Sequence, residues 1–381
     1  MHKASLSWTT DGGWRSAEPL PAASDLVIYF GSREALGNPR VYDELRSLCP
    51  NAVLTGCSTG GQIIDDDVED DRVAALAMSF ERTKVRQGAL HAKDYPNSFD
   101  AGAELARQLK GDDLTTVFLL VDGLRVNGTA LIEGLKSVLG TSVSLHGGLA
   151  GDGALFQRTL VGANDQPRSG MLCAIGFYGA HIHIGHGSEG GWSVFGPRRR
   201  ITRSKDNVLF ELDGQPALDL YERYLGDEAA GLPSSGLLFP LHIIDPNNPD
   251  NSLVRTVLAV DHEKRSLTFA GDMPEGWAAQ LMRGSIDQLT QGATDAAVSA
   301  RLPQQEGAES GVAFLVSCIG RRLLMGQRTI DEVQAVRDAL GNHVPILGFY
   351  SYGEISPHGK SGFSELHNQT MTIMTLREMA A

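Results

Sequence analysis

The sequence predicts an α/β protein of repeated β-α-β units, with mixed sheets, additional antiparallel strands and two related halves. Residues 56–63 and 348–355 share one pattern: Gly, four residues, Gly, then Gln or Glu, then Ile. Each stretch follows a short apolar run, which is typical of a strand that enters a turn permitted by glycine. In addition, an apolar strand, a helix-like segment and a second apolar strand recur three times. These repeats predict parallel strands joined by right-handed crossovers.

The elements of the three units follow one another along the chain. Strands are predicted at residues 25–30, 52–55, 117–121, 143–145, 312–316 and 344–347, and helices at residues 41–48, 130–139 and 330–340. Gly140 fits the position just after the second helix, where a left-handed residue is common. In the third unit, residues 318–329 are predicted to form a longer loop before the helix.

Further strands are predicted between and after the units, at residues 73–80, 170–177, 181–184 and 370–375, the last of them closing a sheet. Glycines, a proline and arginines interrupt the apolar runs at residues 192–202. We therefore place a boundary there, which gives an N-terminal domain of residues 1–196 and a C-terminal domain of residues 197–381. Beyond the boundary, residues 205–214 predict a strand that ends in a hairpin turn. Residues 231–236 and 245–251 predict loops.

Composition and charge exclude several classes of function. The formal net charge of −13 argues against a nucleic-acid partner. The basic cluster of residues 198–200 with Arg203 fits either a solvated loop or a specific anion site. No apolar run approaches the roughly 20 residues of a membrane-spanning helix, and no secretory signal is visible. The four cysteines are widely spaced, which is typical of reduced thiols. These features predict a cytoplasmic protein without a membrane segment.

Two patterns suggest enzymatic chemistry, and neither is complete. Residues 56–60 fit G-x-S-x-G, in which Ser58 would be a nucleophile. The residues that follow do not form an amphipathic helix, so a glycine-rich turn fits this stretch better. His181 and His183, followed by His186, resemble metal ligands on a strand, although without an assured third ligand exposed strand histidines explain them better. A hydrolase or a metal enzyme therefore stays as an alternative function.

The two glycine loops are the predicted ligand site. Gly56 and Gly348 are predicted at equivalent strand ends, and Tyr350 then takes the place of Ser58. Glu354 and Gln62 also occupy equivalent places, where each would either hydrogen-bond its own turn or anchor a ligand.

Arg321 follows the end of an interior strand, as Glu354 does in the same unit. A guanidinium at that place suits a carboxylate or a haem propionate. We expect Arg321 and Glu354 to line one pocket; an ion pair between them is the competing interpretation.

Several stretches together resemble the FIST family of bacterial sensory proteins. They are residues 55–63, 147–152, 239–241, 317–321, 348–355 and 368–370. The resemblance covers almost the whole chain and implies a ligand-binding input module for signal transduction, not an enzyme. Small ligands such as amino acids are suggested for the family. Because the C-terminal motif lies close to the end of the sequence, we expect the output to come from a separate protein.

The resemblance extends to free-standing FIST proteins that sense nitric oxide through haem, the NosP group. It implies haem b as cofactor, nitric oxide as ligand and a separate histidine kinase as partner. The axial ligand of the haem iron would be His242, with His146 and His183 as further candidates. The alternative is an amino-acid-like carboxylate held by Arg321. The sequence leaves the oligomeric state open, with a homo-oligomer among the alternatives.

Overall fold

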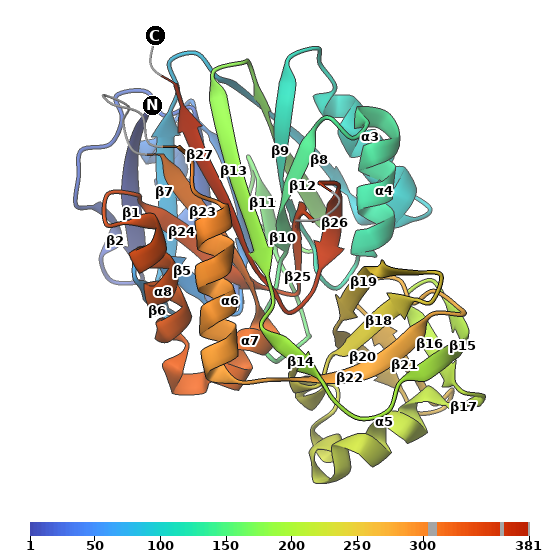
Figure 1. The fold of residues 1–381 in the computed structure, drawn as a ribbon. Coiled ribbons are helices and arrows are strands. Elements are labelled where there is room, and N and C mark those ends of the chain that lie inside the picture. The colour runs from blue at the N-terminus through green and yellow to red at the C-terminus, as the bar shows by residue number, and fades with distance from the viewer. Residues whose placement is uncertain (304–310, 359–361, 380–381) are drawn as a thin grey trace.

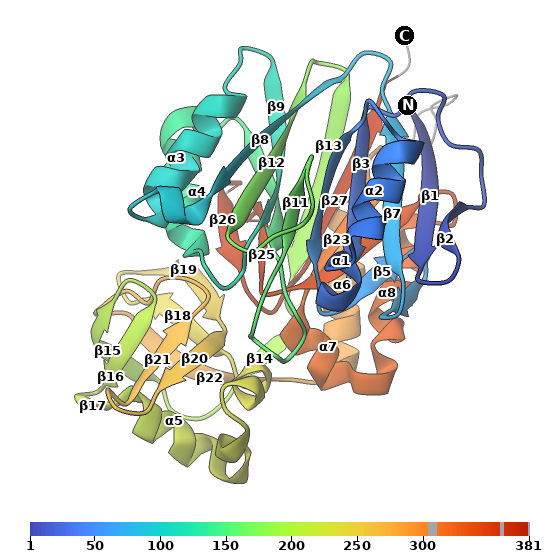
Figure 2. The same ribbon diagram turned by 180° about the vertical axis from the view of Figure 1, so that it is seen from behind.

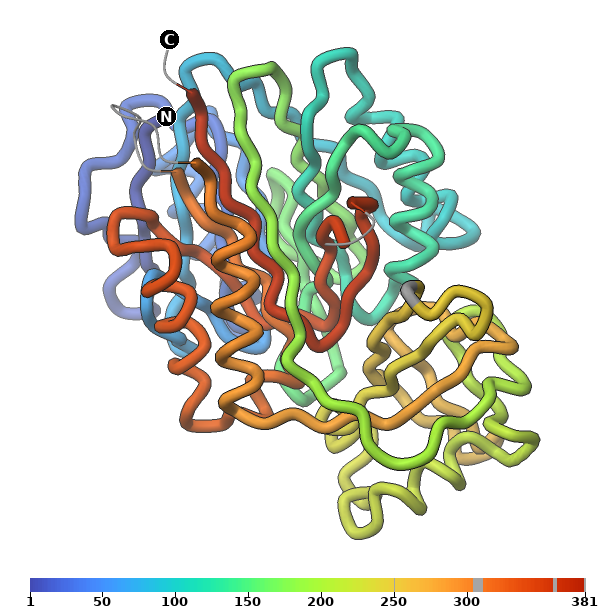
Figure 3. Tube along the Cα trace, viewed as in Figure 1, coloured from blue at the N-terminus to red at the C-terminus, as the bar shows by residue number. Residues whose placement is uncertain are grey.

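The computed structural model describes residues 1–303, 311–358 and 362–379. It consists of a large body of three six-stranded mixed sheets and a smaller β domain with its own sheet. In Figure 1 the small domain lies at one end of the body, and the tube in Figure 3 shows the chain leaving the body for it and then returning. The predicted α/β class with repeated units and additional antiparallel strands is confirmed.

The three predicted units form the centres of the three body sheets. In each unit two parallel strands are joined by a helix. The first unit is β3 (Leu26–Gly31), α2 (Pro39–Leu48) and β4 (Val53–Ser58); the second is β9 (Leu114–Val121), α4 (Gly128–Leu139) and β10 (Ser144–Leu149); the third is β23 (Val312–Cys318), α8 (Ile330–Leu340) and β24 (Ile346–Ser351). Gly140 ends α4 with a φ of 76°, as predicted.

An antiparallel strand then returns beside the first strand of each unit. These strands are β7 (Val73–Ser79), β12 (Met171–Tyr178) and β27 (Met371–Glu378), and each is flanked by a further strand, β1 (His2–Thr9), β8 (Lys84–His91) or β13 (Ile182–Glu189). The strand predicted at residues 370–375 therefore does not close a sheet. It lies inside one, between β13 and β23.

The strand after each glycine loop leaves its own unit and joins another. β5 (Gln62–Ile64) pairs with β24 of the third unit, β25 (Gly353–Pro357) with β10 of the second, and β11 (Val161–Ala163) with β4 of the first. This cyclic exchange gives the body an approximate threefold arrangement. The predicted domain boundary between residues 196 and 197 does not separate the sheets, because strands that precede it share sheets with strands that follow it. The two domains therefore stay a prediction.

The inner faces of the three sheets form one apolar core. The Phe30 and Phe349 ring centroids lie 4.5 Å apart, and those of Phe118 and Phe314 lie 5.3 Å apart, so aromatic rings of different units meet there. Helices cover the outer faces, as Figures 1 and 2 show from opposite sides. α2 covers the first sheet, α3 (Ser98–Leu109) and α4 the second, and α6 (Ile286–Ser299) and α8 the third.

The small domain packs a nine-stranded sheet against α5 (Ala217–Leu225). Its main strands are β15 (Arg199–Lys205), β16 (Val208–Leu212), β18 (Leu241–Asp245), β19 (Asn248–Arg255), β20 (Val257–Asp261), β21 (Ser266–Phe269) and β22 (Ala278–Gly284). The predicted hairpin turn is present, because β16 turns back into β17 (Gln215–Pro216). Two 3₁₀ helices follow α5, η2 (Gly226–Gly231) and η3 (Ser234–Leu238).

Three segments predicted as loops are partly regular. η3 begins at Ser234 within residues 231–236, and β19 begins at Asn248 within residues 245–251. β19 is the end strand of its sheet, where a proline such as Pro249 costs no ladder hydrogen bond. The predicted long loop of residues 318–329 contains α7 (Ile319–Met325).

The remaining elements are short. They are β2 (Gly13–Ser16), α1 (Arg33–Leu36), β6 (Asp67–Glu69), η1 (Ala92–Asp94), β14 (Trp192–Val194), η4 (Gly326–Arg328) and β26 (Ser364–His367). No helix in the described ranges is long and apolar enough to cross a membrane.

Candidate functional site

Each unit ends its second parallel strand, β4, β10 or β24, in a loop, and the three loops meet at the centre of the body. Three equivalent backbone hydrogen bonds link them in a ring: Gly60 N to Tyr350 O at 2.9 Å, Gly151 N to Ser58 O at 3.0 Å, and Tyr352 N to Leu149 O at 3.1 Å. Each unit thus donates to one neighbour and accepts from the other. The meeting point lies at the carboxyl ends of the parallel strands, the end at which open α/β sheets hold ligands.

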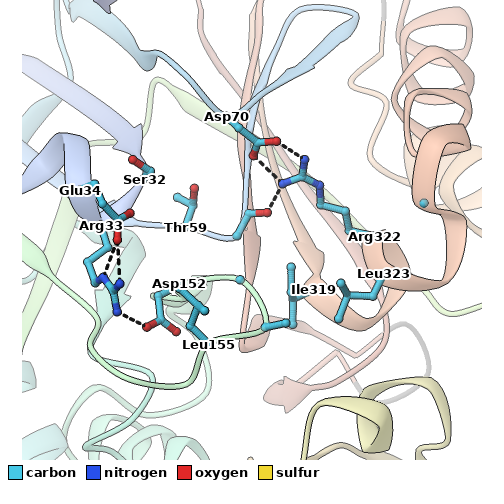
Figure 4. A pocket seen from close by; sticks show the side chains of 14 residues that line it. Ser32, Arg33, Glu34, Thr59, Asp70, Asp152, Leu155, Ile319, Arg322 and Leu323 are labelled. Carbon is cyan, nitrogen blue, oxygen red and sulfur yellow. Dashed lines mark hydrogen bonds and ion pairs between the residues drawn. The ribbon is translucent and has the colours of Figure 1, made fainter. Parts of the chain in front are cut away.

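A cavity of about 490 Å³ opens at this meeting point, and we call it the central pocket (Figure 4). All three units contribute to its walls. The lining residues are Ser32, Arg33 and Glu34 after β3, Thr59 and Gly60 after β4, Asp70, residues 152–155 after β10, and Ile319, Arg322, Leu323 and Gly326 of α7 and its end. The pocket lies in the glycine-loop region, where the sequence predicted a ligand, but none of the predicted site residues lines it.

Arg33 forms one wall of the central pocket. It directly follows Ser32, whose side chain caps α1, so that the start of this short helix fixes its backbone. Its guanidinium donates to Glu34 Oε1 from Nε at 3.0 Å and from Nη2 at 2.7 Å. Nη1 also donates to Asp152 Oδ2 at 3.1 Å. The side chain of Arg33 is 20% exposed, so it remains accessible from the pocket.

Arg322 lies on the opposite wall in Figure 4. Its Nη1 and Nη2 donate to the two carboxylate oxygens of Asp70 at 2.8 and 2.7 Å, and Nη1 also donates to the carbonyl oxygen of Gly60. The guanidinium carbon lies 5.4 Å from the centroid of the Tyr350 ring, within the range of a cation–π contact. α7 thus holds a guanidinium over the meeting point of the loops.

Asp152 is the fixed acid of the central pocket. Its Oδ2 accepts the backbone N–H groups of Gln157 and Arg158, both at 2.9 Å. Its Oδ1 accepts the hydroxyl of Tyr352. The side chain is only 1% exposed. Asp152 therefore shapes the loop after β10 and orients Arg33 through their shared hydrogen bond.

Arg321, the predicted ligand-binding arginine, lies next to Arg322 in α7 and points into the protein. Its Nε and Nη2 donate to Glu332 Oε2 at 2.9 and 2.8 Å, and Nη2 donates to the carbonyl oxygen of Leu289 at 2.8 Å. It is fully buried and does not line the central pocket. Arg321 therefore neither lines a pocket with Glu354 nor forms an ion pair with it, and both expectations are wrong. Its ion-pair partner is the buried Glu332.

Tyr350 and Glu354 are also buried and outside the central pocket. The Tyr350 hydroxyl donates to Glu332 Oε1 at 2.8 Å, although its backbone belongs to the ring of loop hydrogen bonds. Glu354 accepts the Ser351 hydroxyl at 2.6 Å and the Thr370 hydroxyl at 3.0 Å. Burial raises the pKa of Glu354 to about 8. These contacts favour the interpretation that Glu354 stabilises its own turn.

Gly56 and Ser58 lie in β4, and neither lines the central pocket. Gly56 faces Tyr29 of β3 as Gly348 faces Leu315 of β23, so the two glycines are topologically equivalent, as predicted. Ser58 Oγ donates to the carbonyl oxygen of Gly151 at 2.8 Å and accepts the backbone N–H of Leu160 at 2.9 Å. A fully buried hydroxyl with both roles filled is poorly placed to act as a nucleophile.

The three candidate haem ligands lie on three different strands. His146 is buried in β10, where burial lowers its pKa to about 3, and its ring centroid lies 6.1 Å from that of His186. His183 is exposed on β13. His242 is half-buried in β18 of the small domain. None of them lines the central pocket.

The metal alternative is not assembled either in the described part of the chain. Of the predicted pair, His183 lies on β13 and His181 lies just before the strand begins. His186 is three residues from His183 and therefore faces the opposite side of the sheet. Within residues 1–303, 311–358 and 362–379, no three His, Cys, Asp or Glu side chains are grouped so that they could hold a metal ion.

Sequence reasoning missed Arg33, Arg322 and Asp152, although a signal existed for each. Arg321 was singled out because it follows the end of an interior strand, and the same argument applies to Arg33 after β3. Asp152 lies within the FIST-like stretch of residues 147–152 but was given no role. Arg322 was overlooked because only a helix over residues 319–325 decides which of two adjacent arginines faces the pocket.

Comparison with known proteins decides the family. The FIST N domain matches residues 25–215, and the FIST C domain matches residues 217–357. The chain belongs to the FIST family. FIST domains indicate a sensory role in signal transduction.

A relative from Methanocaldococcus jannaschii, "Uncharacterized protein MJ1623", is 25% identical in an alignment 342 residues long that covers 79% of this chain and 61% of that protein. The chain thus spans about three fifths of the length of this relative.

Proposed function

We propose that this FIST protein is a cytoplasmic sensor that binds a small, amino-acid-like carboxylate in the central pocket, and that it is a binding protein and not an enzyme. Family membership supports the sensory role. The observation that carries the ligand class is the placement of Arg33 and Arg322 on facing walls of one cavity (Figure 4). A guanidinium presents a fixed fork of donors that matches a carboxylate in a bidentate geometry.

The walls of the central pocket also touch the small domain, which offers a route for signal output. The Ser234 hydroxyl of η3 donates to the carbonyl oxygen of Ala154, a lining residue, at 3.0 Å. η3 also packs against α7, which carries Arg322. A ligand that tightens either wall would therefore act on η3. We propose that the small domain reports occupancy to a separate partner, such as a histidine kinase.

Isothermal titration calorimetry with a panel of free amino acids and small carboxylates tests the proposed function. At least one member should bind the wild-type protein saturably and raise its melting temperature. Arg322→Gln should weaken that binding by about tenfold or more, because a charged hydrogen bond contributes roughly 1.5–3 kcal/mol. The matched control is Arg125→Gln, since Arg125 is exposed and does not line the central pocket. A panel in which nothing binds would overturn the proposal.

Haem-based sensing of nitric oxide is the second candidate, and one feature of His242 supports it. Its Nδ1 is buried without a hydrogen-bond partner among the described residues, as a free axial ligand would require. Across the sheet His242 faces Val254 and Gln280, a mixed and not an apolar wall. The fit to haem is therefore partial, and a haem on His242 would sit at β18 instead of the central pocket.

A visible spectrum decides between the two candidates. If haem binds through His242, haem added to the purified protein should give a coloured complex that shifts with nitric oxide, and His242→Ala should abolish the spectrum. His183→Ala, at an exposed histidine, is the control. A protein that stays colourless at stoichiometric haem contradicts the haem candidate and leaves the carboxylate sensor standing.

A further inference from the structure

The ligand class of the central pocket can be narrowed further, on the basis of the proposed function. We infer that the pocket is built for a small dicarboxylate, with one carboxylate on Arg33 and the other on Arg322. In the ligand-free protein, Glu34 forms an ion pair with Arg33, and Asp70 forms one with Arg322. Both acids give way when the ligand binds.

Arg322 and Asp70 form a bidentate pair at the rim of the central pocket. The two N–O distances are 2.8 and 2.7 Å, the arrangement that a ligand carboxylate would adopt. The Asp70 side chain is 61% exposed, whereas Arg322 is 22% exposed. The acid therefore lies mostly in solvent and the guanidinium mostly in the pocket wall. Asp70 can turn outward while Arg322 stays in place.

Arg33 on the other wall is also paired with an exposed acid, although both of its donors meet the same oxygen, Glu34 Oε1. Glu34 accepts from Nε and Nη2 of Arg33 at 3.0 and 2.7 Å. Its side chain is 67% exposed, and that of Arg33 is 20% exposed. Asp152 binds the remaining Nη1 but is locked by backbone N–H groups and is 1% exposed. One acid on Arg33 is thus exchangeable and the other is permanent.

Replacing the two exposed acids costs little. Exposed ion pairs contribute roughly 0–1 kcal/mol, because solvent screens them and two side chains lose freedom. A ligand carboxylate between the walls would lie in a less exposed place than Asp70 or Glu34 and keep the same hydrogen bonds. Each guanidinium can therefore exchange one acidic side chain for one carboxylate of the ligand. Two guanidinium groups thus match a ligand with two carboxylates.

The charge pattern disfavours a neutral zwitterion. An ammonium group needs a carboxylate that is not already paired with a cation. All three acids of the central pocket, Glu34, Asp70 and Asp152, bind an arginine. If a ligand carboxylate displaced one of the exposed acids, that acid would move outward into solvent and away from the ligand.

One side of the region between the two arginines is apolar. In Figure 4 Leu155 and Ile319 lie on that side between Arg33 and Arg322, Leu323 lies beside Arg322, and Thr59 lines the other side. Leu155 and Leu323 are 53% and 39% exposed, so both present apolar surface that a ligand can cover. A chain of methylene groups between two carboxylates would cover these side chains. The pocket therefore has charged ends and one apolar side between them, which suits the methylene chain of a linear dicarboxylate.

Calorimetric titration of matched acids tests this inference. Succinate, glutarate and adipate are compared with butanoate, pentanoate and hexanoate, which have the same chain lengths and one carboxylate fewer, and with L-alanine. At least one dicarboxylate should bind ten times more tightly than its partner of equal length, since a charged hydrogen-bonded contact contributes roughly 1.5–3 kcal/mol. Arg33→Gln should remove this advantage.

Asp70→Asn provides a second, independent readout. It removes the internal competitor of Arg322, so dicarboxylate affinity should rise by about two- to fivefold, the value of an exposed ion pair. Asp71→Asn is the matched control, because it removes the same charge one residue away from an exposed side chain that does not line the pocket. Because Asp70 is mostly exposed, this variant is expected to fold normally.

The possible outcomes separate the two proposals. If a monocarboxylate or L-alanine binds as tightly as every dicarboxylate, the inference is overturned while the proposed carboxylate sensor stands. If dicarboxylates bind best but Asp70→Asn equals wild type, the role of Asp70 as an internal competitor is overturned. If no carboxylate of any kind binds, both the inference and the proposed function fail.

Discussion

Glu354 and Gln62 follow equivalent turns in the third and first units, and each accepts a hydroxyl three residues earlier. Ser351 Oγ donates to Glu354 Oε1 at 2.6 Å, and Thr59 Oγ1 donates to Gln62 Oε1 at 2.8 Å. The same structural role is thus filled once by a neutral amide and once by an acid. The acid carries a pH dependence that the amide lacks, because burial raises the pKa of Glu354 to about 8.

Glu354 should make the protein less stable as the pH rises. Its pKa is about 4.5 before the shift and about 8 when folded, so between these values the folded protein holds a proton that the unfolded chain has lost. The free energy of unfolding therefore falls across this window, by a few kcal/mol in total.

Urea denaturation at several pH values from 5 to about 9 measures this effect against Glu354→Gln. The variant copies the first unit and should show a weaker fall with pH. Taking the difference between the two proteins removes the contributions of buried histidines such as His146, which act in the opposite direction. Identical pH profiles for wild type and variant would show that Glu354 is ionised throughout.

Arg321 and Arg322 are adjacent in α7 and should respond differently to substitution. Arg321→Ala leaves the buried Glu332 without its cation, which costs about 3–5 kcal/mol of the free energy of unfolding. Arg322→Ala breaks a partly exposed pair with Asp70 and should cost about 1 kcal/mol or less. Only Arg322→Ala should lose carboxylate binding at a temperature where both variants are folded.

Chemical denaturation measures the stability of the two variants, and calorimetry measures their carboxylate binding. A stable Arg321→Ala protein with weakened binding would show that Arg321, and not Arg322, binds the ligand.

At the scale of elements, the glycines of the second parallel strands are needed for close packing. Neither Gly56 nor Gly348 is among the residues with positive φ; in the first glycine turn it is Gly61 that has a φ of 137°. A Cβ at Gly56 would overlap the carbonyl oxygen of Tyr29, and one at Gly348 would overlap that of Leu315. The repeated glycine therefore records the close approach of a neighbouring strand.

Gly56→Ala should lower the free energy of unfolding by about 1–3 kcal/mol through overpacking. Gly151→Ala is the matched control in the same group of loops, because its Cβ would meet its nearest atoms at 3.4 Å, an ordinary contact. Chemical denaturation of the two variants gives the comparison. Equal stability of both would mean that β4 can shift to make room.

The elements that sequence reasoning found are those with local signals. Apolar runs and closing glycines located β3, β9, β23 and the helices that follow them. α7 was missed because Ile319–Met325 has no side-chain cap and contains a glycine and two charged residues. Its helical form depends on packing against η3, which belongs to a distant part of the chain.

At the scale of the whole molecule, the threefold exchange of strands was beyond a sequence argument. No strand was predicted at β5, β11 or β25. Their partners could not have been predicted either, since pairing depends on which edges remain free after each unit has folded. The composition of the central pocket follows from that exchange, because it brings Arg33, Asp152 and Arg322 from three units together. Sequence reasoning placed the ligand at the glycine loops and assigned it residues that serve the scaffold.

The same arrangement predicts that the pocket and the small domain respond together. η3 contacts both walls: Ser234 binds the carbonyl of Ala154, and the Leu237 carbonyl accepts the Gln369 side chain at 2.7 Å beside α7. No residue of η2 or η3 lines the central pocket. A change in their amide exchange on ligand binding would therefore report coupling and not direct contact.

Hydrogen-exchange mass spectrometry with and without the tightest-binding carboxylate of the panel measures this coupling. Residues 226–238 should exchange more slowly when the central pocket is saturated, whereas β8, which lies at the edge of the second sheet, should not change. Ser234→Ala should reduce the protection of residues 226–238 and leave the affinity within about twofold, because Ser234 holds the wall from outside. Protection confined to the lining residues, in wild type as in the variant, would show that occupancy does not reach the small domain and that any output surface lies on the body.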